Sequence, residues 1–146
     1  MDSDINMSDI VSRKSRGYYT ERKLVKLLSQ NKENYVFRVP VSGSRSSRKA
    51  IVAFPDVFLV NNVKSTIVAF EVKSTIKDRV RVKKSQIIKL AKFLYPFKKY
   101  KKREIVIAVW FVKESKWVFK KINNLMGLDN YYIIKSTDES NWEPLI

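Results

Sequence analysis

The stretch that decides the fold is residues 52–73, with the sequence VAFPDVFLVNNVKSTIVAFEVK. Two runs of β-branched, aromatic and aliphatic residues lie on either side of Asn61-Asn62, a pair that is typical of turns. The pattern predicts two strands, near 52–60 and 66–73, which the turn joins in an antiparallel hairpin.

Three charged side chains of the hairpin are expected to meet at one end of it. Side chains alternate between the two faces of a strand, so Glu71 and Lys73 point to the same face. Asp56 follows a proline at the start of the first strand and can lie near Glu71. Glu-x-Lys is common in a lysine-rich chain and Pro-Asp is an ordinary turn, but a solvated pair is less expected at the end of a strand this apolar.

A pair of carboxylates next to a lysine is suited to phosphodiester hydrolysis. Oxygen ligands of this kind suit Mg²⁺ or Mn²⁺, and Mg²⁺ sites keep several waters and use one or two carboxylates. The ion lowers the pKa of a bound water and neutralises charge on a phosphate. Lys73 would orient that water or stabilise the developing negative charge. The hairpin therefore predicts a metal-dependent phosphodiesterase site.

Segments on both sides of the hairpin add two helices and further strands. Apolar residues recur at spacings of three and four in 16–30 and 84–97, which predicts helices, and Pro96 ends the second. Apolar runs predict additional strands at 35–39, 80–82, 104–112, 116–120 and 131–134. We expect an α/β fold with a central mixed β-sheet flanked by helices, in one domain over 16–146 after a flexible tail at 1–15.

The composition excludes several classes of enzyme. The 146 residues include no cysteine, which excludes disulfides, zinc–thiolate sites and cysteine nucleophiles. The absence of histidine excludes Ser-His-Asp hydrolysis and histidine-dependent ribonucleases. Catalysis in this chain must use carboxylates, lysine, tyrosine, serine and a metal.

The charge is strongly positive and concentrated in one region. The formal net charge is +16, and residues 77–103 contain 12 Lys and Arg against one acid. Such a field attracts nucleic acid or an anionic membrane. We expect seven basic residues to contact the phosphates of a nucleic acid: Arg45, Arg48, Lys49, Arg79, Arg81, Lys83 and Lys84.

Two other readings of this charge remain open at this point. The chain could be a nucleic-acid-binding protein without catalytic activity, with the basic region as its binding face. A basic amphipathic helix over 84–101 could instead lie on a membrane surface. No signal peptide is expected at the polar N-terminus and no apolar run is long enough to span a bilayer, so the expected location is the cytoplasm.

Five short motifs occur in a single order that matches a known family. They are Gly17-Tyr-Tyr-Thr-Glu21-Arg22, Arg38-Val-Pro40-Val-Ser42-Gly43-Ser44, Pro55-Asp56, Phe70-Glu71-Val72-Lys73-Ser74, and Gln86 at the second helix. The Pro-Asp and Glu-x-Lys elements match the signature of the PD-(D/E)xK nuclease superfamily. More narrowly, residues 16–97 resemble the archaeal Holliday junction resolvases of the Hjc/Hje type.

This resemblance implies a restriction-endonuclease-like core and a set of roles. It implies that Glu21, Asp56 and Glu71 are metal-associated acids, that Lys73 is the catalytic lysine and that Ser42 acts near the scissile phosphate. The implied enzyme is an Mg-dependent endonuclease, with Mn as a substitute, that binds and resolves four-way (Holliday) DNA junctions by paired phosphodiester hydrolysis. It also implies a homodimer that does not associate with membranes, in an archaeal cell or encoded by an archaeal virus.

The chain departs from the family pattern in two places. Residues 45–54 form a longer stretch before Pro55-Asp56, and residues 104–146 show no clear match. This leaves open a second nuclease reading, a PD-(D/E)xK enzyme acting on duplex or branched repair DNA. For the dimer interface we expect an apolar surface, and the weakly charged C-terminal third offers Trp110, Phe111, Trp117 and Phe119.

Overall fold

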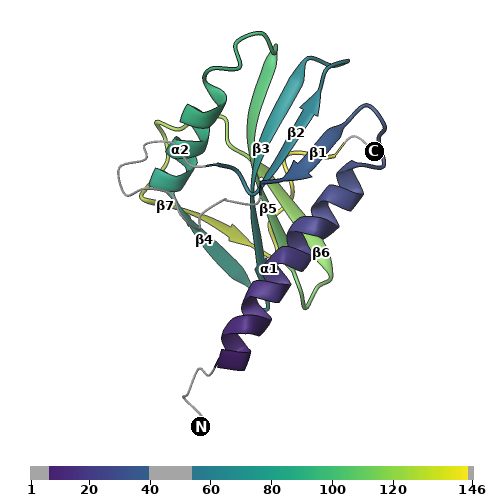
Figure 1. Ribbon diagram of the computed structural model, residues 1–146. Helices are drawn as coiled ribbons and strands as arrows, with labels where there is room; N and C mark the ends of the chain where they lie inside the picture. The colour runs from purple at the N-terminus through teal and green to yellow at the C-terminus, as the bar shows by residue number, and fades with distance from the viewer. Residues whose placement is uncertain (1–6, 40–53, 145–146) are drawn as a thin grey trace.

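The computed structural model describes the backbone of residues 7–39 and 54–144, and the side chains of 17–39 and 54–144. Its elements, in chain order (Figure 1), are α1 (Met7–Leu28), β1 (Tyr35–Arg38), β2 (Val57–Asn61), β3 (Thr66–Thr75), β4 (Arg79–Lys83), α2 (Lys84–Leu94), β5 (Lys102–Phe111), β6 (Lys116–Lys121) and β7 (Tyr131–Lys135).

Five strands form a central sheet in the order β1-β2-β3-β5-β6. β3 and β5 are parallel, and the other neighbouring pairs are antiparallel. The chain passes from β3 to β5 through α2, the kind of crossover that parallel strands require. The prediction of an α/β fold with a mixed sheet is confirmed. β4 and β7 pair separately in a two-stranded antiparallel sheet.

The sheet is covered on both faces (Figure 1). On one face, Leu24 and Leu28 of α1 are fully buried in a cluster with Val68 and Phe70 of β3. On the other face, α2 and the β4–β7 sheet cover a cluster that includes Ile67 of β3. Because β3 has helices on both sides, its residues 67–70 are buried without a break, as expected for a central strand with both faces covered.

Several element boundaries differ from those the sequence predicted, most of them by one or two residues. α1 begins at Met7 rather than near residue 16, so 7–15, expected as part of a flexible tail, is helical. The segment contains no proline or glycine, and extending an existing helix costs far less than nucleating one. β2 begins at Val57, after Asp56, and α2 ends at Leu94, before Pro96. Residues 52–53 lie outside the described part of the chain.

Two of the residues offered for a dimer interface belong to the core instead. Phe111 and Phe119 are buried in the two clusters that flank the sheet. Trp110 and Trp117 are half-buried and contact each other across the β5–β6 pair, with ring centroids 5.3 Å apart. Alternation along β5 and β6 brings one phenylalanine to each face, where both are needed as core residues.

The C-terminal segment covers the outer side of β6. The backbone N–H of Asn141 donates to the carbonyl of Phe119 at 3.0 Å, and the Asn141 side chain bonds both backbone groups of Lys121. Ser140 Oγ accepts from the Phe119 N–H at 2.9 Å. At the other edge of the sheet, no described strand pairs with the outer side of β1.

Candidate active site

The β2–β3 hairpin places Asp56 beside the end of β3 that carries Glu71 and Lys73. The register pairs Val57 with Phe70, and the Asp56 N–H continues the ladder by donating to the Phe70 carbonyl at 2.9 Å. The Asp56 carboxylate also accepts a bond from the Val72 N–H at 2.9 Å. The predicted juxtaposition of Asp56 with Glu71 and Lys73 is therefore what the register produces.

Glu71 is a buried carboxylate with two polar partners. Its Oε2 lies 3.3 Å from Lys73 Nζ, and its Oε1 accepts a bond from Gln86 Nε2 of α2 at 3.4 Å. Burial, reinforced by the charge of Asp56, raises the pKa of Glu71 to about 7, although Lys73 and Gln86 oppose the shift. Glu71 is therefore a carboxylate whose charged form is disfavoured mainly by burial.

Glu21 approaches the same acids from α1. Its Oε1 is 3.0 Å from Arg38 Nε of β1, and both side chains are partly buried. Burial is the main cause that raises the pKa of Glu21, the bond from Arg38 lowers it, and the charge of Asp56 raises it again. Asp56 thus interacts electrostatically with both Glu71 and Glu21.

The chemistry of this set suits a hard divalent cation. Mg²⁺ is usually held by one or two carboxylates and retains several waters. Asp56 and Glu71 provide two, and a cation between them would favour the charged form of Glu71, which burial and then the charge of Asp56 disfavour. In the described ranges, no three Asp, Glu, His or Cys side chains are grouped so as to hold a metal. Glu21 is bonded to Arg38 in this structure, and its role as a metal-associated acid stays a prediction.

Two further residues, Arg38 and Gln86, contact the acids, and the sequence pointed to them only as members of motifs. Arg38 neutralises Glu21, and Gln86 connects α2 to Glu71. Both contacts join elements distant in sequence, so only the motifs that contain these residues could have pointed to them. Ser42, Arg45, Arg48 and Lys49 lie outside the described residues, and their predicted roles stay predictions.

The other predicted DNA contacts fall into two groups. Arg79, Arg81 and Lys83 alternate along β4 and are all exposed. Lys84 begins α2, and its Nζ donates to the Leu128 carbonyl at 3.1 Å. Lys84 therefore has a partner inside the protein, whereas the three β4 side chains extend toward solvent.

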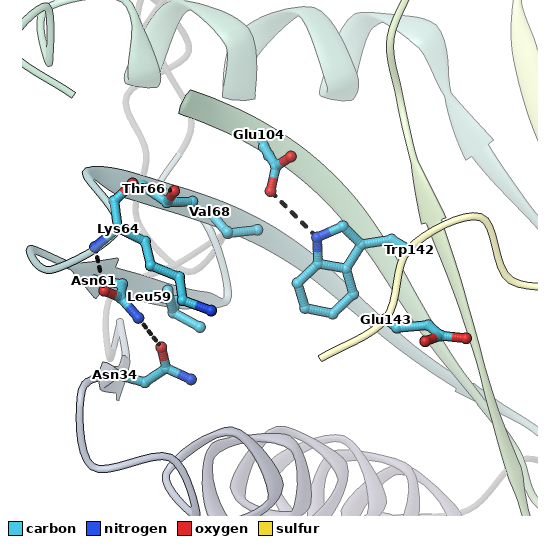
Figure 2. A pocket seen from close by; sticks show the side chains of 9 residues that line it. All are labelled: Asn34, Leu59, Asn61, Lys64, Thr66, Val68, Glu104, Trp142 and Glu143. Atoms are coloured by element: carbon cyan, nitrogen blue, oxygen red, sulfur yellow. Dashed lines mark hydrogen bonds between the residues drawn. The ribbon is translucent and has the colours of Figure 1, made fainter. Parts of the chain in front are cut away.

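A pocket elsewhere in the molecule contains none of these acids (Figure 2). It lies at the opposite end of the β2–β3 hairpin, near Asn61 and Lys64, and the C-terminal Trp142 forms one wall. Trp142 Nε1 donates to Glu104 at 3.2 Å, and Glu104 is also paired with Lys121 at 3.1 Å. The polar groups of this pocket hold the C-terminal segment against the sheet.

Within the described ranges, no helix has the length and hydropathy needed to cross a membrane.

Comparison with known proteins gives three related findings. The family model described as archaeal Holliday junction resolvase (Hjc) matches residues 12–143. The crossover junction endodeoxyribonuclease Hje of Sulfolobus acidocaldarius is 34% identical over 113 residues, covering 77% of this chain and 74% of that protein. A crossover junction endodeoxyribonuclease of Sulfolobus islandicus rod-shaped virus 1 is 38% identical over 124 residues, covering 78% of this chain and 95% of that protein.

A solved structure has the same fold. The Hjc of Archaeoglobus fulgidus, described as a Holliday junction resolvase from an archaeal hyperthermophile, aligns with a TM-score of 0.58 at 18% identity. The alignment covers 84% of this chain and 85% of that one. The family match extends over residues 104–143, where the sequence showed no clear correspondence. This chain belongs to the archaeal Holliday junction resolvase (Hjc) family.

Proposed function

We propose that this protein is a metal-dependent endonuclease that resolves four-way DNA junctions by paired phosphodiester hydrolysis. Membership in the family supports the reaction, and one structural observation supports the site. Asp56 and Glu71 lie together at the end of the hairpin, where Glu71 is buried with a raised pKa and Lys73 Nζ is 3.3 Å from it. Two carboxylates next to a lysine are an arrangement suited to a cation and a phosphate.

The residues of this chain would divide the work as follows. Asp56 and Glu71 would hold Mg²⁺, which Mn²⁺ could replace, and the ion would supply charge neutralisation and an activated water. Lys73, held by Glu71, would stabilise the negative charge that develops on the phosphate. Gln86 would orient Glu71, because it donates to the oxygen that Lys73 does not contact.

Glu21 and Ser42 would act at the margin of the site. Glu21 is held by Arg38 and its pKa responds to the charge of Asp56, so it would bind ordered water or shift the charge balance at the ion. The role of Ser42 rests on the resemblance alone: it would contact the DNA near the scissile phosphate. Both residues support the reaction that Asp56, Glu71 and Lys73 would perform.

We also propose a homodimer, with a different interface from the one offered by the sequence. An aromatic surface, defined here as Tyr35, Phe37, Phe54, Phe93 and Phe97, lies between β1 and α2. Its rings form a continuous chain of contacts through the buried Phe58, with centroids 5.3–5.9 Å apart. Tyr35 is 71% exposed and Phe54 is 51% exposed. Exposed aromatic clusters of this kind are typical of protein interfaces.

The decisive experiment compares a four-way junction with a linear duplex of the same arm sequence. Each is incubated with the protein in Mg²⁺, in Mn²⁺ and in EDTA. We expect symmetrical cuts in opposed strands of the junction, only with metal. Equal cutting of the duplex would favour a PD-(D/E)xK nuclease for duplex or branched repair DNA. Binding without cleavage in either metal would favour a non-catalytic binding protein.

A further inference from the structure

The β4–β7 sheet is a two-stranded ribbon with one buried face and one exposed face. On the buried face, Val82 and Ile134 are almost completely covered by the core next to α2. Val80 and Tyr132 pack against the same core, and alternation along both strands brings the other six residues to the opposite face. The register sets these residues opposite each other in three pairs: Arg79 with Lys135, Arg81 with Ile133, and Lys83 with Tyr131. All six are exposed.

The exposed face of the ribbon combines four cations with two large apolar groups. Arg79, Arg81, Lys83 and Lys135 supply the positive charge. Tyr131 is 42% exposed and Ile133 is 47% exposed.

Few contacts within the described residues neutralise this face. The Arg81 guanidinium lies 4.2 Å from the ring centroid of Tyr131, which holds both side chains in place. Asp78 lies beside the face: its carboxylate is 3.3 Å from Arg79 Nε, interacts electrostatically with Lys135 and is largely in solvent. Asp138 in the following turn accepts from the Lys135 backbone N–H, which directs its carboxylate toward that turn. The face therefore keeps most of its positive charge.

The ribbon is close to the candidate active site along the chain and in space. Three residues, 76–78, connect the Lys73 end of β3 to β4, and β4 runs directly into α2, which carries Gln86. The other basic run, 98–103, leads into β5 where Lys102 pairs with Thr66, at the opposite end of β3 from Lys73. Of the two basic surfaces, the ribbon is therefore the one placed beside the reacting groups.

We infer that the exposed face of the β4–β7 ribbon enters the major groove of a DNA duplex arm beside the active site. The four cations would contact phosphates, and Ile133 and Tyr131 would contact sugars and base edges. A two-stranded ribbon fits a major groove roughly 12 Å wide, and cations on phosphates provide affinity and register. Three of the six residues come from β7, which gives a DNA-contacting role to part of the C-terminal third. The inference rests on the proposed function, because a junction supplies the duplex arms.

Site-specific crosslinking tests the placement directly. The variant Ile133→p-benzoylphenylalanine should crosslink to a labelled arm of a four-way junction on irradiation, at nucleotides near the cleavage site. The matched control is Val63→p-benzoylphenylalanine, because Val63 is also an exposed aliphatic residue but lies in the β2–β3 turn. Crosslinks from position 63 and not from position 133 would overturn the inference.

Salt dependence tests the charge of the face. Arg81→Gln combined with Lys135→Gln should reduce the slope of log affinity against log salt by about 2, since each phosphate contact contributes roughly 0.9. Lys99→Gln combined with Lys101→Gln removes the same charge from exposed positions of the distant run and should reduce the slope less. Equal slopes for the wild type and the Arg81/Lys135 variant would contradict the inference.

A third variant separates apolar contact from charge. Ile133→Thr keeps a β-branched residue in the strand, so it should weaken junction binding several-fold with an unchanged salt slope. Unchanged affinity would remove Ile133 from the contact. If the wild type cuts junctions and the ribbon variants bind junctions with the same affinity and salt slope as the wild type, only this inference fails. If the wild type neither binds nor cuts DNA, the proposed function fails first.

Discussion

The carboxylate of Asp56 accepts a hydrogen bond, 2.9 Å long, from the backbone N–H of Val72, the residue between Glu71 and Lys73. One acid of the site is thus bonded to the strand that carries the other acid and the lysine. The arrangement of the three side chains is consequently a property of the register between β2 and β3. The buried residues of β3 determine this register, since a one-residue slip would turn each of those residues to the opposite face of the sheet.

Loss of any one of these three groups should stop cleavage while DNA binding persists. We expect Asp56→Asn, Glu71→Gln and Lys73→Ala to lower the single-turnover rate by roughly 10²-fold or more, because a catalytic metal supplies several kcal/mol. Junction affinity should change little, since Lys and Arg contacts to phosphates dominate it. Glu33→Gln is the matched control, an exposed acid in the turn before β1. Normal cleavage by all three variants would show that the site is elsewhere.

Stability without metal should fall as pH rises from about 4.5 to 7. The pKa of Glu71 is raised in the folded protein, so the folded state binds more protons than the unfolded state in this range, and protonation stabilises it there. The shift from 4.5 to about 7 corresponds to about 3 kcal/mol at most. Thermal unfolding in EDTA should show a smaller pH dependence for Glu71→Gln than for the wild type.

The stabilisation of the folded protein by metal should depend on pH in the opposite direction. A carboxylate must lose its proton to bind the ion, so the increase in Tm caused by Mg²⁺ should grow as pH rises through about 7. Glu71→Gln should lose both the increase and its pH dependence. A Tm that responds to Mg²⁺ equally in the variant would indicate that the ion binds at another position.

Glu21 and Arg38 should behave as a unit. Glu21→Gln and Arg38→Gln should each slow cleavage, by about 10–100-fold if the pair orients groups around the metal. The double variant should be little slower than the slower single variant, because each change already breaks the 3.0 Å contact. Single-turnover rates for the four proteins give the coupling. Strictly additive effects would mean that the two residues act independently.

The aromatic surface should control the oligomeric state. Tyr35→Ser combined with Phe54→Ser removes two exposed rings and should shift sedimentation toward the monomer without lowering the Tm greatly. Val63→Ser combined with Met126→Ser removes exposed apolar groups elsewhere and should leave the dimer intact. Dissociation by the second pair alone would place the interface on another face.

Paired incision can be tested with mixed dimers. Active protein mixed with Asp56→Asn protein should nick one strand of a junction in a supercoiled plasmid and give open circles, whereas active dimers should produce linear DNA. A C₂ dimer predicts this result because it offers one site to each of two opposed strands. Linear product that merely scales with the amount of active protein would indicate independent monomers.

The sequence was most informative where local patterns determine structure. The hairpin of β2 and β3, the helical segments and the α/β class follow from periodicity and turn residues, and the family resemblance is confirmed by the match over residues 12–143. Contacts between distant elements could not be predicted in this way. The Glu21–Arg38 pair and the pairing of β4 with β7 both depend on tertiary packing.

The aromatic residues illustrate the same limit. Phe111 and Phe119 lie in apolar strands, a pattern that a core strand and an interface strand share, and the structure buries both. Tyr35 and Phe37 lie in a strand of the same kind, but β1 is at the edge of the sheet and their rings are exposed. Position in the sheet, which the sequence does not contain, decides between the two outcomes.

The segment that bonds to the outer side of β6 also restricts how copies of this protein can associate. A sheet with two open edges can add neighbours on both sides and grow into a filament. Here Ser140 and Asn141 occupy backbone groups of β6, so in the described part of the chain β1 is the edge left for a partner. Two copies that meet through β1 form a closed pair with nothing left to extend. The C-terminal segment would thus favour closed pairs over open-ended filaments, even at high local concentration on DNA.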